Sequence, residues 1–296
     1  MNSTPEVVVV GVDFSHGSDR AADWAADEAD RRNARLLLVH GEPLRQVLGG
    51  DAAWSLSQES ERRIEDAATS ALDGLASRLR TTHPALEIET RVSDDYPGAA
   101  LVAEDRPGAI LVVGSQGRSA IGRMFVGSVG LHVVHQATCP VVVVRGSEIV
   151  HQGPVVVGVD GSPASAEAVG FAFEEAALRG VPLRAVLAWN PREVFTYGGW
   201  AVIGPPVEDL QRDALRSLDE ALAGWSEKFP EVEVHRSAPA AHPTQALAAA
   251  TSRAQLLVVG SHGRHGLPRV VLGSVSSAVV LHADCPVAVV RPAVTR

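Results

Sequence analysis

The chain contains the same arrangement of glycines twice, and this repeat limits what it can fold into. A Gly-x-x-Gly pair is followed after nine residues by Gly-Ser in both copies. The residues are Gly114, Gly117, Gly127 and Ser128 in the first copy and Gly260, Gly263, Gly273 and Ser274 in the second. The copies lie 146 residues apart, which is the length of a domain and not of a solenoid unit.

Matching segments also open and close each half of the chain. A Val-Gly-Val-Asp segment ends at Asp13 and again at Asp160, and the Cys-Pro pair at Cys139 recurs at Cys285. Each half of the 296 residues is long enough to bury its own core. We therefore expect two tandem domains, at 1–146 and 153–296, joined by a linker at 147–152.

Short apolar runs rich in Val, Leu and Ile alternate with helical patterns, five runs in each half. In the first half the runs are 7–10, 36–39, 86–90, 110–113 and 141–144. In the second half they are 155–157, 183–187, 232–235, 256–259 and 287–290. Continuous apolar runs are typical of strands that are covered on both faces. The pattern predicts α/β domains, each a doubly wound and mostly parallel sheet with helices on both faces.

Helix ends can be predicted as well. Ser162 is expected to be the N-cap of a helix that begins at Pro163 and ends at Gly180. In the first half Ser15 or Ser18 is the corresponding cap. Longer helices are expected near 59–80 and 208–228.

Composition excludes several classes of partner. The net charge is −9 and the only lysine is Lys228, so a nucleic-acid surface or an anionic membrane surface is not expected. No apolar run approaches the roughly 18 residues of a membrane span, and the N-terminus has no signal-peptide pattern. The equivalent positions of Cys139 and Cys285 are poor support for a disulfide, which favours a cytoplasmic location.

The repeated residues predict a phosphate site. In an open parallel sheet, ligands bind beyond the carboxyl ends of the strands, where the winding reverses. Asp13 and Asp160 end the first strand of each half, and Gly114 and Gly260 end the fourth. Glycine lets phosphate oxygens approach backbone N–H groups, and a helix N-terminus adds partial positive charge. The Asp would accept from a ribose hydroxyl or hold Mg²⁺.

Other interpretations remain beside this one. The two aspartates can instead cap helices, and a strand–turn–helix junction often needs one glycine for packing. The P-loop and the dinucleotide fingerprint are both missing. His262, His265 and His282 have no histidine counterparts in the other half, so we expect no metal site built from protein ligands alone.

With two copies of these motifs, the chain resembles a tandem universal stress protein of the ATP-binding type, over nearly its whole length. The resemblance implies the adenine nucleotide alpha hydrolase-like fold, with five parallel strands in each half. It also implies ATP and Mg²⁺ as ligands, pairing of the domains through their last strands, a homodimer and a role in stress adaptation.

Site residues follow from the same resemblance. Asp13 and Asp160 would lie near the ribose or the metal, and the repeated glycines and serines would surround the phosphates. Gly41 and Trp189 take the position of the family's adenine contact, where an aliphatic residue is usual. Trp189 either stacks on adenine or fills its pocket. Phe14, where the second half has Gly161, is a smaller departure.

Three functions fit this resemblance. The first is an ATP-binding regulatory protein whose nucleotide occupancy tunes conformation, dimerisation or partner binding. The second is a slow ATPase on the same scaffold. The third is a nucleotide-free dimeric scaffold. We favour the first, because no catalytic base is evident in the sequence.

Overall fold

A computed structural model of the chain describes most of its residues. The described residues are 6–43, 58–115, 127–146, 150, 152–189, 196–197, 200–201, 207–263 and 272–292. Internal contacts divide the chain into two compact units, Met1–Val144 and Arg145–Arg296. Of the predicted linker 147–152, only Val150 and Gln152 lie within the described residues.

The first unit is a parallel sheet of five strands with helices between them. Its elements are β1 Val7–Gly11, α1 His16–Arg32, β2 Arg35–Gly41, α4 Gln58–Thr82, β3 Ile88–Ser93, α5 Pro97–Val102, β4 Ala109–Gly114, α6 Ser128–Gln136 and β5 Val141–Val144. The strand order is β3-β2-β1-β4-β5, and every pairing is parallel.

The second unit repeats this topology. Its elements are β6 Val155–Gly158, α7 Pro163–Arg179, β7 Leu183–Val186, α9 Val207–Lys228, β10 Val234–Ser237, α10 Pro243–Ala250, β11 Leu256–Gly260, α11 Ser274–His282 and β12 Val287–Val290. The order is β10-β7-β6-β11-β12, again parallel throughout. A separate two-stranded hairpin pairs β8 Thr196–Tyr197 with β9 Trp200–Ala201. The predicted doubly wound α/β class is confirmed.

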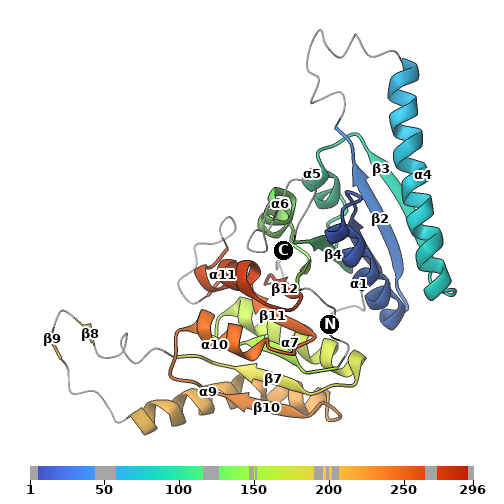
Figure 1. The fold of residues 1–296 in the computed structure, drawn as a ribbon. Coiled ribbons are helices and arrows are strands. Elements are labelled where there is room, and N and C mark those ends of the chain that lie inside the picture. The colour runs from blue at the N-terminus through green and yellow to red at the C-terminus, as the bar shows by residue number, and fades with distance from the viewer. Residues whose placement is uncertain are drawn as a thin grey trace. The chain divides into compact units, whose positions relative to one another are not determined.

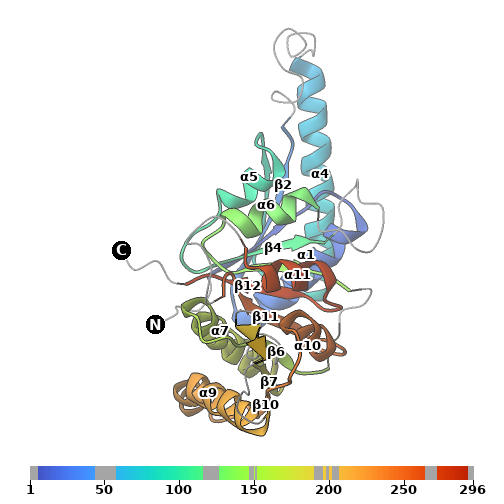
Figure 2. The same ribbon diagram turned by 90° about the vertical axis from the view of Figure 1, so that its left-hand side faces the viewer.

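Helices cover both faces of each sheet (Figures 1 and 2). In the first unit α1 and α4 lie on one face, where Arg78 of α4 contacts Asp23 of α1 at 2.6 Å, and α5 and α6 pack together on the other. In the second unit α7 and α9 lie on one face, joined by the stacked rings of Phe173 and Trp225, and α10 and α11 lie on the other. This layering follows from right-handed crossovers that reverse direction after the third strand.

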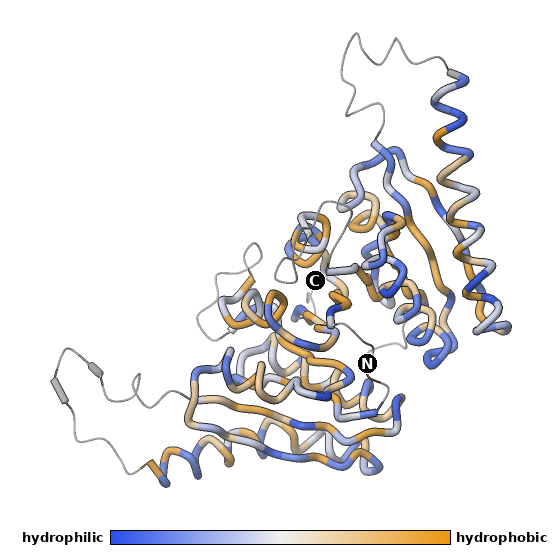
Figure 3. The backbone as a smooth tube through the Cα atoms, in the orientation of Figure 1, coloured by the Kyte–Doolittle hydropathy of each residue, from blue (hydrophilic) through white to orange (hydrophobic). Residues whose placement is uncertain are grey.

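The cores consist mainly of the strands. The tube of the central strands is mostly apolar, whereas the long helices α4 and α9 alternate between polar and apolar residues (Figure 3). Every residue of β5 and β12 is buried, as the continuous apolar runs predicted. The half-exposed edge strands β3 and β10 begin two residues later than predicted. Leu86 and Val232 are buried just ahead of these strands, so each apolar run begins before the strand itself does.

Helix ends follow the predicted chemistry. The Ser162 side chain accepts from the backbone N–H of Ser165, Pro163 is the first helical residue, and Gly180 ends the helix with φ 62°. In the first unit the cap is Ser15, and Ser18 is its partner in the hydrogen bond. No helix in the described ranges is long and apolar enough to cross a membrane.

Candidate functional site

The site lies where the winding of each sheet reverses. In the second unit β6 and β11 are neighbours, and their connections leave toward opposite edges of the sheet. The gap between those connections opens at the carboxyl ends of both strands, which is where α/β sheets bind ligands. Asp160 stands two residues after β6, and Gly260 is the last residue of β11.

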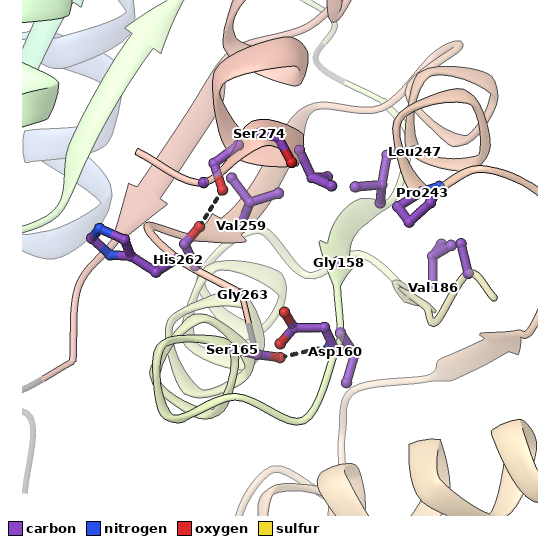
Figure 4. A pocket seen from close by; sticks show the side chains of 16 residues that line it. Gly158, Asp160, Ser165, Val186, Pro243, Leu247, Val259, His262, Gly263 and Ser274 are labelled. Atoms are coloured by element: carbon purple, nitrogen blue, oxygen red, sulfur yellow. Dashed lines mark hydrogen bonds between the residues drawn. The ribbon is translucent and has the colours of Figure 1, made fainter. Parts of the chain in front are cut away.

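A cavity of about 170 Å³ occupies this position in the second unit. The ends of β6, β7 and β11, the start of α11 and one face of α10 line it (Figure 4). The structure brings five of the six predicted residues of this unit to its wall: Asp160, Gly260, Gly263, Gly273 and Ser274. These residues come from segments that are about a hundred positions apart in the chain, so the cavity joins motifs that the sequence predicted separately.

Asp160 has a structural role as well as a place in the cavity. Its Oδ1 accepts from the backbone N–H of Ser162 at 2.9 Å, and its own N–H donates to Ser165 Oγ at 3.1 Å (Figure 4). Ser162 is the N-cap of α7, so the aspartate orders the turn that begins this helix. The half-buried carboxylate still reaches the cavity wall. The capping and ligand interpretations of Asp160 are therefore compatible.

Two of the glycines leave room at the cavity. A Cβ placed on Gly263 would lie 2.8 Å from Asp160 Oδ2, so a side chain here would displace the carboxylate. Gly273 is the N-cap of α11. Glycine offers no side-chain oxygen to the N–H groups of the first helical turn, which leaves those donors available to a ligand. Ser274 is exposed beside them.

Gly260 is needed for a different reason. A Cβ on Gly260 would lie 2.8 Å from the carbonyl carbon of Ala164, in the backbone of α7. The equivalent Gly114 would meet the carbonyl oxygen of Gly17 in α1 at 2.7 Å. Both glycines let the first helix of the unit cross close to the fourth strand. The structure thus supports the packing interpretation at these two positions.

The loop that follows β11 is fastened by serine hydroxyls. Ser276 Oγ donates to the Gly260 carbonyl at 2.6 Å, and Ser162 Oγ donates to the His262 carbonyl at 3.2 Å. The His262 ring points away from Asp160 and from α10 (Figure 4). Among the described residues, no three His, Cys, Asp or Glu side chains form a group that could hold a metal ion.

The first unit repeats most of this arrangement. Asp13 Oδ1 accepts from the backbone N–H of Ser15 at 3.1 Å, and Ser15 caps α1. Gly127 is the N-cap of α6, and Ser128 is exposed in its first turn. Gly117 lies outside the described residues.

The end of the second strand is where the two units differ. Gly11 pairs with Val39 and Gly158 with Val186, so the counterpart of Gly41 is Ala188. Ala188 lines the cavity. Trp189 is one residue further on and does not line it, and its indole N–H donates to the Ala238 carbonyl at 3.2 Å. The structure therefore does not bring Trp189 to the other predicted residues.

Gly41 is buried against main chain. A Cβ there would lie 2.6 Å from the Cα of Pro97, at the start of α5. Phe14 in the same unit has φ 60°, a left-handed conformation that is uncommon for a bulky residue, and its ring lies 4.7 Å from the ring of His40. In the second unit Gly161 takes the corresponding turn with φ 77°. The two units thus differ in the residue at this turn and in the residue two positions beyond the paired valine of the second strand.

Sequence reasoning missed the residues that α10 contributes. Pro243 and Leu247 line the cavity opposite the phosphate-type motifs, and Val186 and Ala188 adjoin them. A proline at the first helical position followed by small residues, Pro243 to Ala250, was the available signal. Ser165 and Ser276 are also on the wall and were not predicted.

Comparisons with known proteins agree on the family and the fold. A model of the universal stress protein family matches residues 5–145 and 153–291. A universal stress protein of Mycolicibacterium smegmatis is 38% identical over 296 residues, covering 98% of this chain and 99% of that protein. A universal stress protein of Mycobacterium tuberculosis is 38% identical over 300 residues, covering 96% of each. The crystal structure of a universal stress protein from Archaeoglobus fulgidus has a similar fold, with a TM-score of 0.71 at 18% identity, covering 98% of this chain and 100% of that one.

Proposed function

Because the chain belongs to the universal stress protein family, we propose that it is a regulatory protein whose second unit binds ATP with Mg²⁺. One observation carries the proposal: Asp160, Gly263, Gly273 and Ser274 meet at one cavity at the switch point of the sheet. A carboxylate, a main-chain path without side chains and an uncapped helix N-terminus are the groups that a nucleotide needs.

Each part of the cavity takes one part of the nucleotide in this proposal. The phosphates lie at the amino end of α11, beside Ser274, where N–H donors and the helix dipole favour negative charge. Asp160 accepts from a ribose hydroxyl or holds the Mg²⁺ that would screen the phosphates. The base lies toward the apolar side chains of Val186, Pro243 and Leu247.

Binding alone is enough for regulation. A ligand that binds only the folded state at about a thousand times its dissociation constant adds about 4 kcal/mol of stability. Occupancy would therefore change the stability of the second unit and of any surface that it orders. A slow ATPase is the alternative, and steady release of phosphate at saturating ATP would favour it.

Mass spectrometry of nucleotide extracted from the purified protein, with calorimetric titration of Mg–ATP, tests the proposal. We expect adenine nucleotide in the extract and binding that weakens at least about tenfold in Asp160→Ala. Asp13→Ala, which changes the equivalent residue of the other unit, is the matched control and should bind Mg–ATP as the wild-type chain does. Unchanged ATP binding by Asp160→Ala and by Gly263→Ala would contradict the assigned cavity.

A further inference from the structure

A second cavity of the second unit lies on the other flank of α10. It has a volume of about 440 Å³ and is lined by β7, β10 and α10. Pro243 and Leu247 of α10 face the nucleotide cavity, whereas Gln245, Ala246 and Ala249 face this one. One short helix thus lies between the two cavities, and Val186 is the one lining residue that they share.

The first unit fills the equivalent space with an ion cluster. Arg91 and Arg106 both contact the carboxylate of Glu104, Arg106 at 3.2 Å, and Glu104 is only 6% exposed. The strand register makes Ser237 the counterpart of Arg91, since these residues pair with Val186 and Val39. Ala250 is the counterpart of Glu104. Each residue stands three positions after a leucine whose side chain lies against the glycine in the first strand of its unit. Short side chains have replaced the cluster, which opens the cavity.

The second unit also brings a charge to this cavity. Arg184 on β7 takes the position of Leu37, as the pairings with Val156 and Val9 show. Arg184 is a half-buried residue, and in the described part of the chain no carboxylate or hydrogen-bond acceptor contacts its guanidinium. The other arginine of the cavity, Arg236, is different, because its Nε contacts Asp219 of α9 at 2.6 Å. The guanidinium of Arg184 is therefore available to pair with an anionic group of a ligand in this cavity.

The neighbours of Arg184 define what it would bind. His235 is its Cα partner on β10, so both side chains leave the same face of the sheet, and His235 Nε2 lies 3.4 Å from Glu233 at the rim. The wall opposite is the alanine face of α10. A guanidinium matches the two oxygens of a carboxylate or phosphate in geometry as well as charge, and an alanine wall takes an alkyl group.

We infer that this cavity is a binding site for a small organic anion, held by Arg184 through its acid group and by the alanines of α10 through its apolar part. The site does not depend on the proposed nucleotide site. Short-chain carboxylates and alkyl phosphate monoesters both combine an acid group with an apolar chain, and titration with one of each distinguishes between them.

Calorimetric titration with hexanoate, propyl phosphate and the neutral hexanamide tests the inference on the full chain. We expect one or both anions to bind and hexanamide to bind at least about tenfold more weakly, because a charge-assisted hydrogen bond is lost. Arg184→Leu, which introduces the residue that the first unit has at this position, should weaken anion binding at least about tenfold. Arg184→Lys should weaken anion binding less than that. Asp160→Ala should leave the anion titration unchanged.

Ala250→Glu is a second variant that keeps Arg184 in place. It introduces the carboxylate that the first unit carries at this position, and we expect it to compete for the guanidinium and abolish anion binding. Thermal unfolding of both variants shows whether the fold is retained. Failure of every anion to bind, equal binding of hexanamide, or full binding by the folded Arg184→Leu variant would overturn the inference.

Discussion

Glycines that look equivalent in the sequence are needed for different physical reasons, and substitution separates them. At Gly263 a methyl group would lie 2.8 Å from Asp160 Oδ2, so we expect Gly263→Ala to displace this carboxylate, weaken Mg–ATP binding about tenfold and lower the unfolding free energy by about 1 kcal/mol through the turn that Asp160 orders. Gly224→Ala in α9 is the matched control, because nothing lies within 4 Å of that site. It should bind normally and gain about 0.5–1 kcal/mol of unfolding free energy. Titration calorimetry and urea unfolding measure the two effects.

Substitution of Gly260 should affect stability more strongly. Its added methyl group would meet the backbone of Ala164, which cannot rotate aside as a side chain can. We expect Gly260→Ala to lower the unfolding free energy by about 2 kcal/mol or more in urea titrations. Gly114→Ala should do the same in the first unit, where the Gly17 backbone lies in the way. A Gly260→Ala variant of unchanged stability would mean that α7 does not cross this close to the strand.

Single residues also mark the limit of prediction from sequence. The glycine motif predicted the cavity wall at Gly263, Gly273 and Ser274, because the residue types themselves carry the chemistry. Trp189 was assigned one position too far along the chain to line the cavity. An apolar run predicts that a strand exists but contains no information on its register, which comes from its neighbours. The pairing of Gly158 with Val186 supplies it.

At the scale of elements, the first helix of each unit carries a buried ion pair. Glu175 and Arg179 contact each other in α7 with side chains 0% and 3% exposed, and Glu28 and Arg32 repeat the pair in α1. Glu175→Leu leaves the Arg179 charge buried without this carboxylate, and we expect a loss of about 3–5 kcal/mol in urea unfolding. The double variant Glu175→Leu, Arg179→Met should recover most of that loss. Asp213→Ala, which removes an exposed pair with Arg216, should change stability by less than about 1 kcal/mol.

Elements were predictable where their apolar pattern is strong, whether or not the element is buried. The central strands and the long helices α4 and α9 were found within about two residues, because apolar runs and 3.6-residue periodicity are strong signals. The short helices α5 and α10 were missed, since six or eight residues hold too few turns to show a period. Helix α10 lies between the two cavities of the second unit and lines both of them. The least predictable helix is therefore the one on which both proposed sites depend.

At the scale of the whole molecule, two units of one fold differ at the base end of the site. In the first unit the ring of Phe14 lies against His40, and the main chain at Pro97 lies against Gly41. The Leu101 side chain also approaches Gly11 more closely than Leu247 approaches Gly158. We expect calorimetry to give about one tight nucleotide per chain, assigned to the second unit. Two equal tight sites, or one that Asp13→Ala removes, would contradict this asymmetry.

Each unit also buries one thiol, and together the two thiols link the stability of the chain to alkaline pH. Burial raises the pKa of Cys285 to about 12, and burial next to Asp105 raises the pKa of Cys139 well above its usual range. In the unfolded chain both thiols ionise near pH 9. Above that pH the unfolded state therefore holds fewer protons than the folded state, so folding stability falls as pH rises.

The size of this effect can be measured. Between about pH 8 and about pH 10 the loss is about 1.4 kcal/mol for each thiol, and twice that for both. We expect urea unfolding of the wild-type chain to lose that much more stability over this range than the Cys139→Ala, Cys285→Ala variant does. Each single variant should remove about half of the difference, because one thiol lies in each unit. Parallel pH profiles of the wild-type chain and the double variant would show that the folded thiols ionise as freely as unfolded ones, and would contradict their burial.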